Sequence, residues 1–365
     1  MKYYIDSEKK ETAYIQLYRQ VKEDIINGVY SYGEKLPSKR LTASETGVST
    51  ITVEHAYGLL CDEGYIESKE RSGYIVIFRQ EDGFMHFSES EEIKPTEYIQ
   101  RSNDDNSMNF TVLEKTMRKV ISEYGEKLFE RSPNEGCIFL RNSIRHYLER
   151  SRGIKTETEN IIIGSGAEYL YGLITDLLGR GKIYGIESPS YKKIEQIYAL
   201  SDVKYESLPL SSDGINSTYL SRTNADILHV TPYRSFPSGV TASASKRHEY
   251  IRWANKNGRY IIEDDFESEF TVSKKPEETI FSISDDDNVI YMNTFSKTIS
   301  PSLRVGYMVL PKHLLEKFNK ELGFYSCTVP TCVQYVLAEL ISNGDFERHI
   351  NKVRRQKRKE LNPKR

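Results

Sequence analysis

Residues 293–307 read Asn-Thr-Phe-Ser-Lys-Thr-Ile-Ser-Pro-Ser-Leu-Arg-Val-Gly-Tyr and begin at the end of a β-branched, strand-like run. Lys297 therefore follows a small hydroxyl residue at a strand end, a setting that suits a lysine forming a Schiff base with a carbonyl compound. The hydroxyls of Thr294 and Ser296 can hold a phosphate, and Arg304 adds a guanidinium fork for the same anion. The stretch thus predicts a Schiff-base lysine beside an anion site. The alternative is an ordinary surface lysine in a loop rich in serine and threonine.

Strand-like and helical patterns alternate on both sides of this stretch, over about residues 107–345. Strands are predicted at 160–166, 182–188, 226–232, 260–266, 289–296 and 304–310, and helices at 168–181 and 246–258. That alternation predicts an α/β domain with a wound sheet. Ser165, Gly166 and Ala167 end the first strand and open a helix, where backbone amides and the serine hydroxyl can cradle a phosphate.

The N-terminal part of the chain, about residues 12–80, reads as three helices followed by a two-stranded hairpin. Apolar side chains of the first segment fall on one helical stripe that ends at Gly28. Ser38 and Ser49 stand where the N-caps of a second and a third helix are expected. Residues 65–78 hold two β-rich runs around a charged turn that contains glycine. Three helices and a hairpin predict a winged helix-turn-helix domain.

In such a domain the third helix enters the major groove of DNA, and residues at its N-terminal end reach the base edges. The second helix is placed for phosphate contacts, and the tip of the wing for the DNA backbone or the minor groove. The alternative is that single residues have structural roles only, with Arg40 on a solvated face and Ser49 as a helix cap. The predicted DNA-contacting residues are Ser38, Arg40, Ser49, Thr50, Thr52, His55, Lys69, Arg71 and Gly73.

Composition restricts the class of protein further. The 365 residues have a formal net charge of −2, so overall charge argues neither for nor against nucleic acid. The four cysteines form no Cys-x-x-Cys pair, which favours free thiols and predicts no metal site. The first residues include charges where a secretory signal needs an apolar run, and no apolar stretch is long enough for a membrane helix. We therefore expect a cytoplasmic protein that does not enter a membrane.

The N-terminal part resembles the GntR-type winged helix over its whole length. The resemblance rests on Gly33-x-x-Leu36-Pro37-Ser38-x-Arg40, Gly47-Val48-Ser49, Thr52-Val53, Gly64 and the wing turn Ser72-Gly73. The later part resembles the large domain of fold-type I aminotransferases, and residues 293–307 resemble their internal-aldimine motif. Together the two parts resemble the MocR subfamily of regulators, over about residues 12–350.

This resemblance implies that Lys297 binds pyridoxal 5'-phosphate as an aldimine. It also implies an aromatic ring stacked on the cofactor at Tyr191, and a carboxylate partner of the pyridine nitrogen at Asp264, with Asp265 as the alternative. A buried carboxylate there keeps the ring nitrogen protonated, so that the ring can accept electrons. A head-to-tail homodimer is implied as well. The residues implied to bind the cofactor are Lys297, Asp264, Arg304, Ser165, Gly166, Ala167, Tyr191, Thr294 and Ser296.

Three departures from the family pattern bear on these expectations. Phe266 stands where relatives usually have tyrosine, and Arg234-Ser235 replaces a usual His-Gln pair, so that Arg234 could face the cofactor's phenolate oxygen instead. The segment at 108–125 lacks the usual stretch with glycine and proline. The C-terminal small domain, which supplies the arginine that grips a substrate carboxylate, is expected to be missing, whether by natural truncation or because the chain is a fragment.

These expectations define a domain plan and a function. The plan is a winged-helix DNA-binding domain at 1–79, a polar, acidic linker at 80–106 and a C-terminally truncated, cofactor-binding, aminotransferase-like domain at 107–365. The predicted function is a regulator that binds double-stranded DNA and responds to pyridoxal phosphate or to a small amino compound. The alternatives are an aminotransferase that uses pyridoxal phosphate, and a DNA-binding dimer with a degenerate cofactor site. The fused DNA-binding domain argues against an enzyme.

Overall fold

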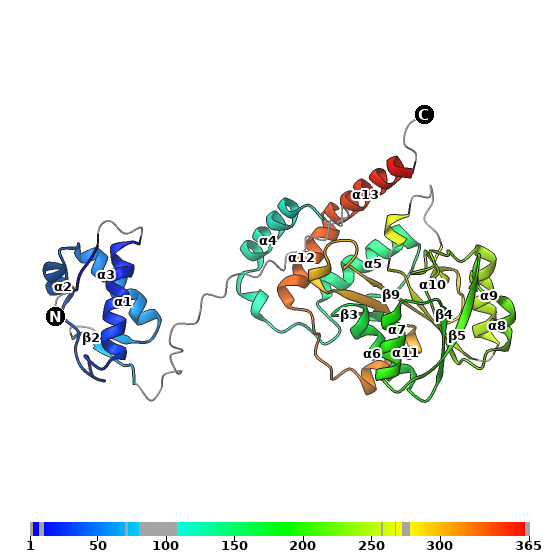
Figure 1. The fold of residues 1–365 in the computed structure, drawn as a ribbon, viewed down its shortest axis with the longest axis horizontal. Coiled ribbons are helices and arrows are strands. Elements are labelled where there is room, and N and C mark those ends of the chain that lie inside the picture. Colours follow the sequence, from blue (N-terminus) through cyan, green and yellow to red (C-terminus); the bar gives the residue numbers. More distant parts are fainter. Residues whose placement is uncertain are drawn as a thin grey trace. The chain divides into compact units, whose positions relative to one another are not determined.

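The computed structural model describes residues 3–6, 11–69, 72–79, 108–256, 258–266, 268–271 and 278–361. The chain divides into two compact units, Met1–Gln100 and Arg101–Arg365 (Figure 1). The expected linker at 80–106 and the wing residue Arg71 lie outside the described residues.

The N-terminal unit consists of three helices and a two-stranded hairpin. The helices α1 (Ala13–Ile26), α2 (Lys39–Thr46) and α3 (Thr50–Asp62) precede the strands β1 (Ile66–Lys69) and β2 (Gly73–Val76). The two strands pair antiparallel, from Ile66 opposite Val76 to Lys69 opposite Gly73. This arrangement is the winged helix-turn-helix that the sequence predicts.

Local sequence explains where these helices begin and end. The Ser38 hydroxyl accepts a hydrogen bond from the amide of Leu41, and the Ser49 hydroxyl accepts one from the amide of Thr52, so both serines are N-caps. Gly47 ends α2 in the left-handed conformation, with φ at 71°, which glycine adopts without strain. The core of the unit holds the buried side chains of Leu17, Val21, Ile25, Leu36, Val53, Ala56, Tyr57, Leu60, Ile66 and Val76.

The second unit contains an eight-stranded sheet with the strand order β3-β10-β9-β8-β7-β4-β5-β6. β9, β8, β7, β4 and β5 run parallel, whereas β10 is antiparallel to both neighbours and β6 is antiparallel to β5. The sheet confirms the predicted α/β class. The strands are β3 (Ile161–Gly164), β4 (Ile183–Ser188), β5 (Lys204–Ser211), β6 (Gly214–Ile215), β7 (Ile227–Val230), β8 (Tyr260–Asp264), β9 (Val289–Thr294) and β10 (Gly306–Val309).

Helices cover both faces of this sheet (Figure 1). Side chains along β9 alternate between the two faces of the sheet, as they do in any β-strand: Val289 and Tyr291 pack on one side, and Ile290 and Met292 pack on the other. The Tyr291 side is covered by α4 (Phe110–Tyr124), α5 (Ile138–Arg152), α8 (Ser217–Arg222), α9 (Ala244–Asn255), α10 (Ile280–Ile283), α12 (Thr331–Ser342) and α13 (Asp345–Leu361). The Met292 side is covered by α6 (Ala167–Leu178), α7 (Lys192–Leu200) and α11 (Lys312–Glu321).

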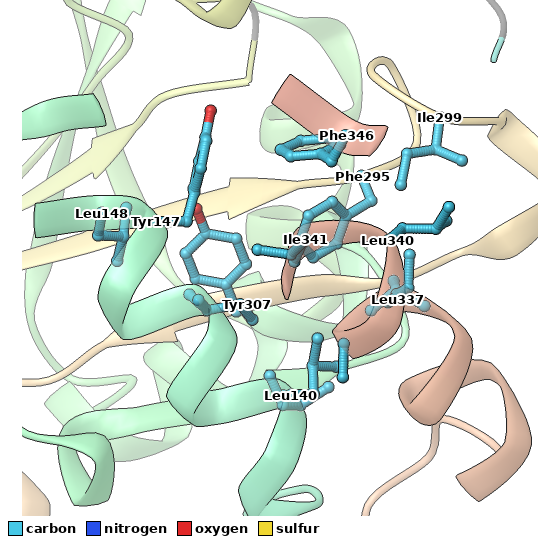
Figure 2. Close-up of a cluster of buried hydrophobic side chains, with 14 of the residues drawn as sticks. Leu140, Tyr147, Leu148, Phe295, Ile299, Tyr307, Leu337, Leu340, Ile341 and Phe346 are labelled. Atoms are coloured by element: carbon cyan, nitrogen blue, oxygen red, sulfur yellow. The ribbon is translucent and has the colours of Figure 1, made fainter. Parts of the chain in front are cut away.

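The turn that follows β9 is anchored in the core on the Tyr291 side. Phe295 and Ile299 are 2% and 1% exposed and pack in the cluster that also contains Leu340 and Phe346 (Figure 2). The rings of Phe295 and Phe346 meet edge to face, with 5.6 Å between their centroids. Lys297 lies between these two anchors and is exposed. Burial of its neighbours therefore fixes the backbone on both sides of the lysine.

Candidate functional site

A cavity of about 380 Å³ lies where β7, β8 and β9 end and where α6 and α7 begin. Ligands of open α/β sheets bind at this carboxyl edge of the strands, and cavities of a few hundred cubic ångströms suit a small ligand. Ser165 and Gly166 belong to the turn just before α6. Among the lining residues are the predicted Ala167, Tyr191, Asp264, Thr294, Ser296, Lys297 and Arg304.

The lysine end of the cavity is formed by the turn after β9. The Thr294 hydroxyl accepts a hydrogen bond from the Ser296 amide at 3.1 Å and lies 3.0 Å from the Ser296 hydroxyl. The amide of Phe295 donates to the carbonyl of Val305 at 2.8 Å, which joins the turn to the segment that leads into β10. These bonds hold Lys297 and both hydroxyl groups at one wall of the cavity.

The anion end of the cavity combines a guanidinium with a helix N-terminus. Arg304 has a left-handed backbone, with φ at 47°. Gly166 also has a positive φ, of 95°, and a Cβ atom there would lie 3.1 Å from Arg304 Nη2. The lack of a side chain at Gly166 thus leaves room for the guanidinium beside the turn that opens α6. The first amides of α6 have no partner within the helix, so cation and amides together suit a phosphate.

Asp264 and Asp265 follow each other at the end of β8 and point to opposite faces of the sheet. Asp264 lines the cavity. Asp265 lies in a buried charge cluster on the other face, where its Oδ2 is 3.3 Å from Arg152 Nε and accepts a hydrogen bond from the Tyr291 hydroxyl at 2.7 Å. The sequence analysis favoured Asp264 as the carboxylate in the cavity and kept Asp265 as the alternative. In the structure, only Asp264 lines the cavity.

Aromatic residues from α6, α7 and β7 surround the Asp264 carboxylate. The Tyr171 hydroxyl donates a hydrogen bond to Asp264 Oδ2, and His229 Nε2 lies 3.7 Å from the same atom. His229 Nδ1 is 2.6 Å from the Tyr198 hydroxyl. Burial and the neighbouring carboxylate hold the pKa of Tyr171 well above its usual value, so this phenol stays a donor. Asp264 Oδ1 is buried and has no hydrogen-bond partner among the described residues.

Sequence reasoning missed these partners and also two carboxyl groups: that of Glu168, which lines the cavity, and that of Glu187, which is buried beside the lining residue Thr231. Glu187, at the end of β4, is 5% exposed, and its carboxylate accepts a hydrogen bond from the Ser235 hydroxyl. Burial raises the pKa of Glu187 to about 8. Arg234 is exposed and is not among the lining residues, whereas Phe266 is one of them. No local pattern distinguishes Tyr171, His229 or Glu187 from ordinary core residues.

Of the predicted DNA-contacting residues, three have hydroxyl groups with partners inside the protein. Ser38 and Ser49 cap α2 and α3, and the hydroxyls of Ser49 and Thr52 lie 2.9 Å apart. The structural role that the sequence left open for Ser49 is therefore present. A contact between these residues and DNA stays a prediction.

Other predicted DNA-contacting side chains are exposed on the helices. Arg40 on α2 and Thr50 on the first turn of α3 face solvent. His55 is exposed as well, and its ring meets the Tyr14 ring edge to face, with 5.8 Å between centroids. This contact with α1 restrains the imidazole.

The wing contributes Lys69 and Gly73 at facing positions of the hairpin. Lys69 is exposed, and its Nζ atom lies 3.8 Å from a carboxylate oxygen of Glu67. Gly73 has a φ of 90°, and a Cβ atom there would lie 3.1 Å from Lys35 Cε. The positive φ favours glycine at this end of β2, whereas the Lys35 side chain is flexible enough to shift away from a Cβ atom.

Among the residues that the structure describes, His, Cys, Asp and Glu side chains form no group of three or more that could hold a metal ion. No helix of the described part is long and apolar enough to span a bilayer.

Comparison with known proteins finds both halves of the chain in described families. Residues 13–76 match bacterial regulatory proteins of the gntR family, and residues 102–362 match aminotransferase class I and II. The chain is 35% identical to the uncharacterized HTH-type transcriptional regulator YdeL of Bacillus subtilis, over 95% of this chain and 77% of that protein. It is 27% identical to the HTH-type pyridoxine biosynthesis transcriptional regulator PdxR of Corynebacterium glutamicum, over 93% of this chain and 75% of that protein.

A third relative is the probable rhizopine catabolism regulatory protein MocR of Rhizobium meliloti, which is 26% identical over 93% of this chain and 74% of that protein. Among solved structures, the multiple substrate aminotransferase of Thermococcus profundus matches 68% of this chain with a TM-score of 0.63 and 25% identity. The match spans 64% of the Thermococcus chain. The kynurenine aminotransferase of Pyrococcus horikoshii, at 24% identity and a TM-score of 0.62, shares the fold. The chain belongs to the MocR-type transcriptional regulators, in which a gntR-family DNA-binding domain precedes an aminotransferase-like domain.

Proposed function

We propose that the aminotransferase-like domain binds pyridoxal 5'-phosphate through Lys297, and that this cofactor, or an amino compound that reacts with it, controls DNA binding by the winged helix. The observation that supports this best is the buried, unpartnered Oδ1 atom of Asp264, in a cavity that Lys297 and Arg304 also line. A buried carboxylate oxygen without a partner is rare in folded proteins, and it favours a ligand with a protonated group at that position.

The cavity offers a partner for each functional group of this cofactor. Lys297 supplies an amine for the aldehyde, and Arg304 with the start of α6 supplies donors for the phosphate. Asp264 Oδ1 is the atom that would accept a hydrogen bond from the protonated ring nitrogen. Tyr191, at the start of α7, supplies an aromatic ring for stacking. The residues present therefore fit the cofactor.

Lys297 would bind the cofactor by condensation, with its Nζ amine joined to the aldehyde carbon and one water molecule released. When bound, pyridoxal phosphate would supply an electrophilic carbon and a ring that accepts the electrons released at the bound group. Asp264 would hold a proton at the ring nitrogen, and the Tyr171 hydroxyl, which donates to Asp264 Oδ2, orients that carboxylate. Phe266 has no hydroxyl, so it offers no hydrogen bond to the phenolate oxygen.

A regulator of this kind acts through a difference in affinity. A ligand controls DNA binding only if it binds the DNA-competent and DNA-incompetent arrangements unequally. We place the winged helix at 1–79, the linker at 80–106 and the sensing domain at 107–365, so that ligand and DNA bind to different domains. The fusion of a cofactor fold to a DNA-binding domain supports sensing over turnover.

We also propose that two copies of the chain form a homodimer. On α4, Phe110, Met117 and Ile121 are 74%, 38% and 59% exposed, at a spacing that places them on one helical stripe. Phe129 and Phe139 nearby in the chain are 92% and 50% exposed. Exposed apolar side chains on one helix face favour a protein partner, and a second copy of the chain would pair two winged helices for two half-sites of DNA.

The experiment is an absorbance titration of the full chain with pyridoxal phosphate, followed by DNA binding with and without the cofactor. We expect a new visible band in the wild type, no band in Lys297→Ala, and a band in Lys192→Ala, whose exposed lysine is outside the cavity lining. DNA affinity should change when the band forms.

Absence of the band in the wild type, or its survival in Lys297→Ala, would refute cofactor binding at this lysine. An unchanged DNA affinity would refute the sensing role. Loss of the band on adding an amino acid, with release of the matching keto acid, would favour the aminotransferase alternative.

A further inference from the structure

Glu168 lies at the anion end of the cavity, although that end is otherwise suited to a negative ligand. It is in the first turn of α6 and lines the same cavity as Lys297. Its Oε2 accepts a hydrogen bond from Arg304 Nη2 at 2.6 Å, and its Oε1 accepts one from Lys193 Nζ. The side chains of Glu168, Arg304 and Lys193 are 36%, 47% and 51% exposed, so the group is reached from solvent.

Glu168 is ionised at neutral pH. The hydrogen bond from Lys193, and then the charge of Arg304, lower the pKa of this carboxyl group below its ordinary value. A carboxylate in the first turn of a helix is also stabilised by the helix dipole. Glu168 therefore uses the same guanidinium and the same helix N-terminus that a phosphate would use.

We infer that Glu168 is a built-in competitor of the cofactor's phosphate group, which keeps loading of the domain reversible. This inference rests on the proposed function and adds to it how the site is regulated. The phosphate, which is mostly a dianion at pH 7, would approach Arg304 with the Glu168 carboxylate beside it. To bind, the phosphate must either draw Arg304 away from Glu168 or lie beside the negatively charged Glu168 carboxylate. Either event weakens phosphate binding without affecting the contacts of the ring or of Lys297.

The inference predicts an effect that depends on the phosphate group. Glu168→Gln removes the charge and keeps the shape of the side chain. We expect the affinity for pyridoxal phosphate to rise about tenfold, because like charges a few ångströms apart repel clearly even in a partly solvated site. The affinity for pyridoxal, which has no phosphate, should stay the same.

The test is an absorbance titration of the full-length wild type and Glu168→Gln with pyridoxal phosphate and with pyridoxal, at matched salt. Inorganic phosphate is added as a competitor in a third series, and it should compete at lower concentration in Glu168→Gln. Dialysis should remove pyridoxal phosphate from the wild type faster than from the variant. The matched control is Glu195→Gln, which neutralises a first-turn carboxylate on α7 that accepts from Ser190 and does not line the cavity.

Each outcome decides one point. Equal affinity of wild type and Glu168→Gln for pyridoxal phosphate overturns the competitor role and leaves the proposed function standing. An equal rise for pyridoxal overturns it too, because the phosphate is then not involved. Weaker binding of pyridoxal phosphate by Glu168→Gln overturns it as well, because Glu168 would then help to position Arg304. If neither protein shows an absorbance change, the proposed function itself is overturned. If Glu168→Gln does not fold, as judged by circular dichroism, Glu168→Asp withdraws the carboxylate from Arg304 and should show a smaller rise of the same kind.

Discussion

Replacing Glu187 with glutamine should change how the stability of the second unit depends on pH. Glu187 is 5% exposed, and burial raises its pKa to about 8 from an ordinary 4.5. Because the pKa in the fold is raised, the protonated form favours the folded state. The stability that protonated Glu187 contributes is fully present below pH 4.5, and it is lost as the pH rises from 4.5 through 8.

The size of this loss follows from the difference between the two pKa values. One pKa unit corresponds to about 1.4 kcal/mol, so ionised Glu187 opposes folding by roughly 3–5 kcal/mol above pH 8. Glutamine has nearly the same shape and no charge at any of these pH values. The Ser235 hydroxyl, which donates to Glu187, can accept from the amide instead, so one hydrogen bond is retained. We expect the two proteins to differ by less than about 1 kcal/mol at pH 5, and the variant to be more stable by roughly 3–5 kcal/mol at pH 8.5.

The assay is urea unfolding between pH 5 and pH 8.5, followed by tryptophan fluorescence. The protein has a single tryptophan, Trp253, which is 8% exposed in the core of the second unit, so the signal reports that unit. Glu263 and Glu269, whose pKa values burial raises to about 8 and about 7, titrate in both proteins and cancel in the difference. Exposed Glu126→Gln serves as the control. A stability difference that stays constant across this pH range would refute the argument.

Three further changes test other parts of the structure. Arg152→Met removes the partner of Asp265 and Glu269 in the buried charge cluster, and it should destabilise the second unit by about 3–5 kcal/mol in urea unfolding at pH 7; a loss below about 1 kcal/mol would contradict the cluster. Ile299→Ala opens a cavity beside the Lys297 turn and should lower stability by about 2–5 kcal/mol, against about 1 kcal/mol for Ile299→Val, measured in the same way. For DNA, Arg40→Ala should weaken binding to specific and random duplexes alike, whereas His55→Ala should change base preference in competition binding; equal losses on both kinds of DNA for both variants would refute that division.

Much of the fold follows from signals within a few residues of one another. Ser38 and Ser49 each cap the helix that begins at the next residue, and the cap is written in the position of one hydroxyl side chain. The strand-like runs at β3, β4, β7, β8, β9 and β10 are apolar enough to predict buried strands. β5 was not predicted, because its side chains are largely polar and incompletely buried. Its backbone pairing with β4 produces no apolar pattern in the sequence.

The sequence by itself determined the winged helix, the α/β class and the segment around Lys297, because periodicity, caps and turn residues act locally. Only the tertiary structure decided which aspartate faces the cavity, that the Tyr171 hydroxyl donates a hydrogen bond to it, and that Glu168 binds Arg304. Tyr171 and Asp264 are 93 residues apart, and Glu168 and Arg304 are 136 apart. Such pairs meet because strand order and helix packing bring distant segments to one edge of the sheet. No periodic pattern within a segment encodes that meeting.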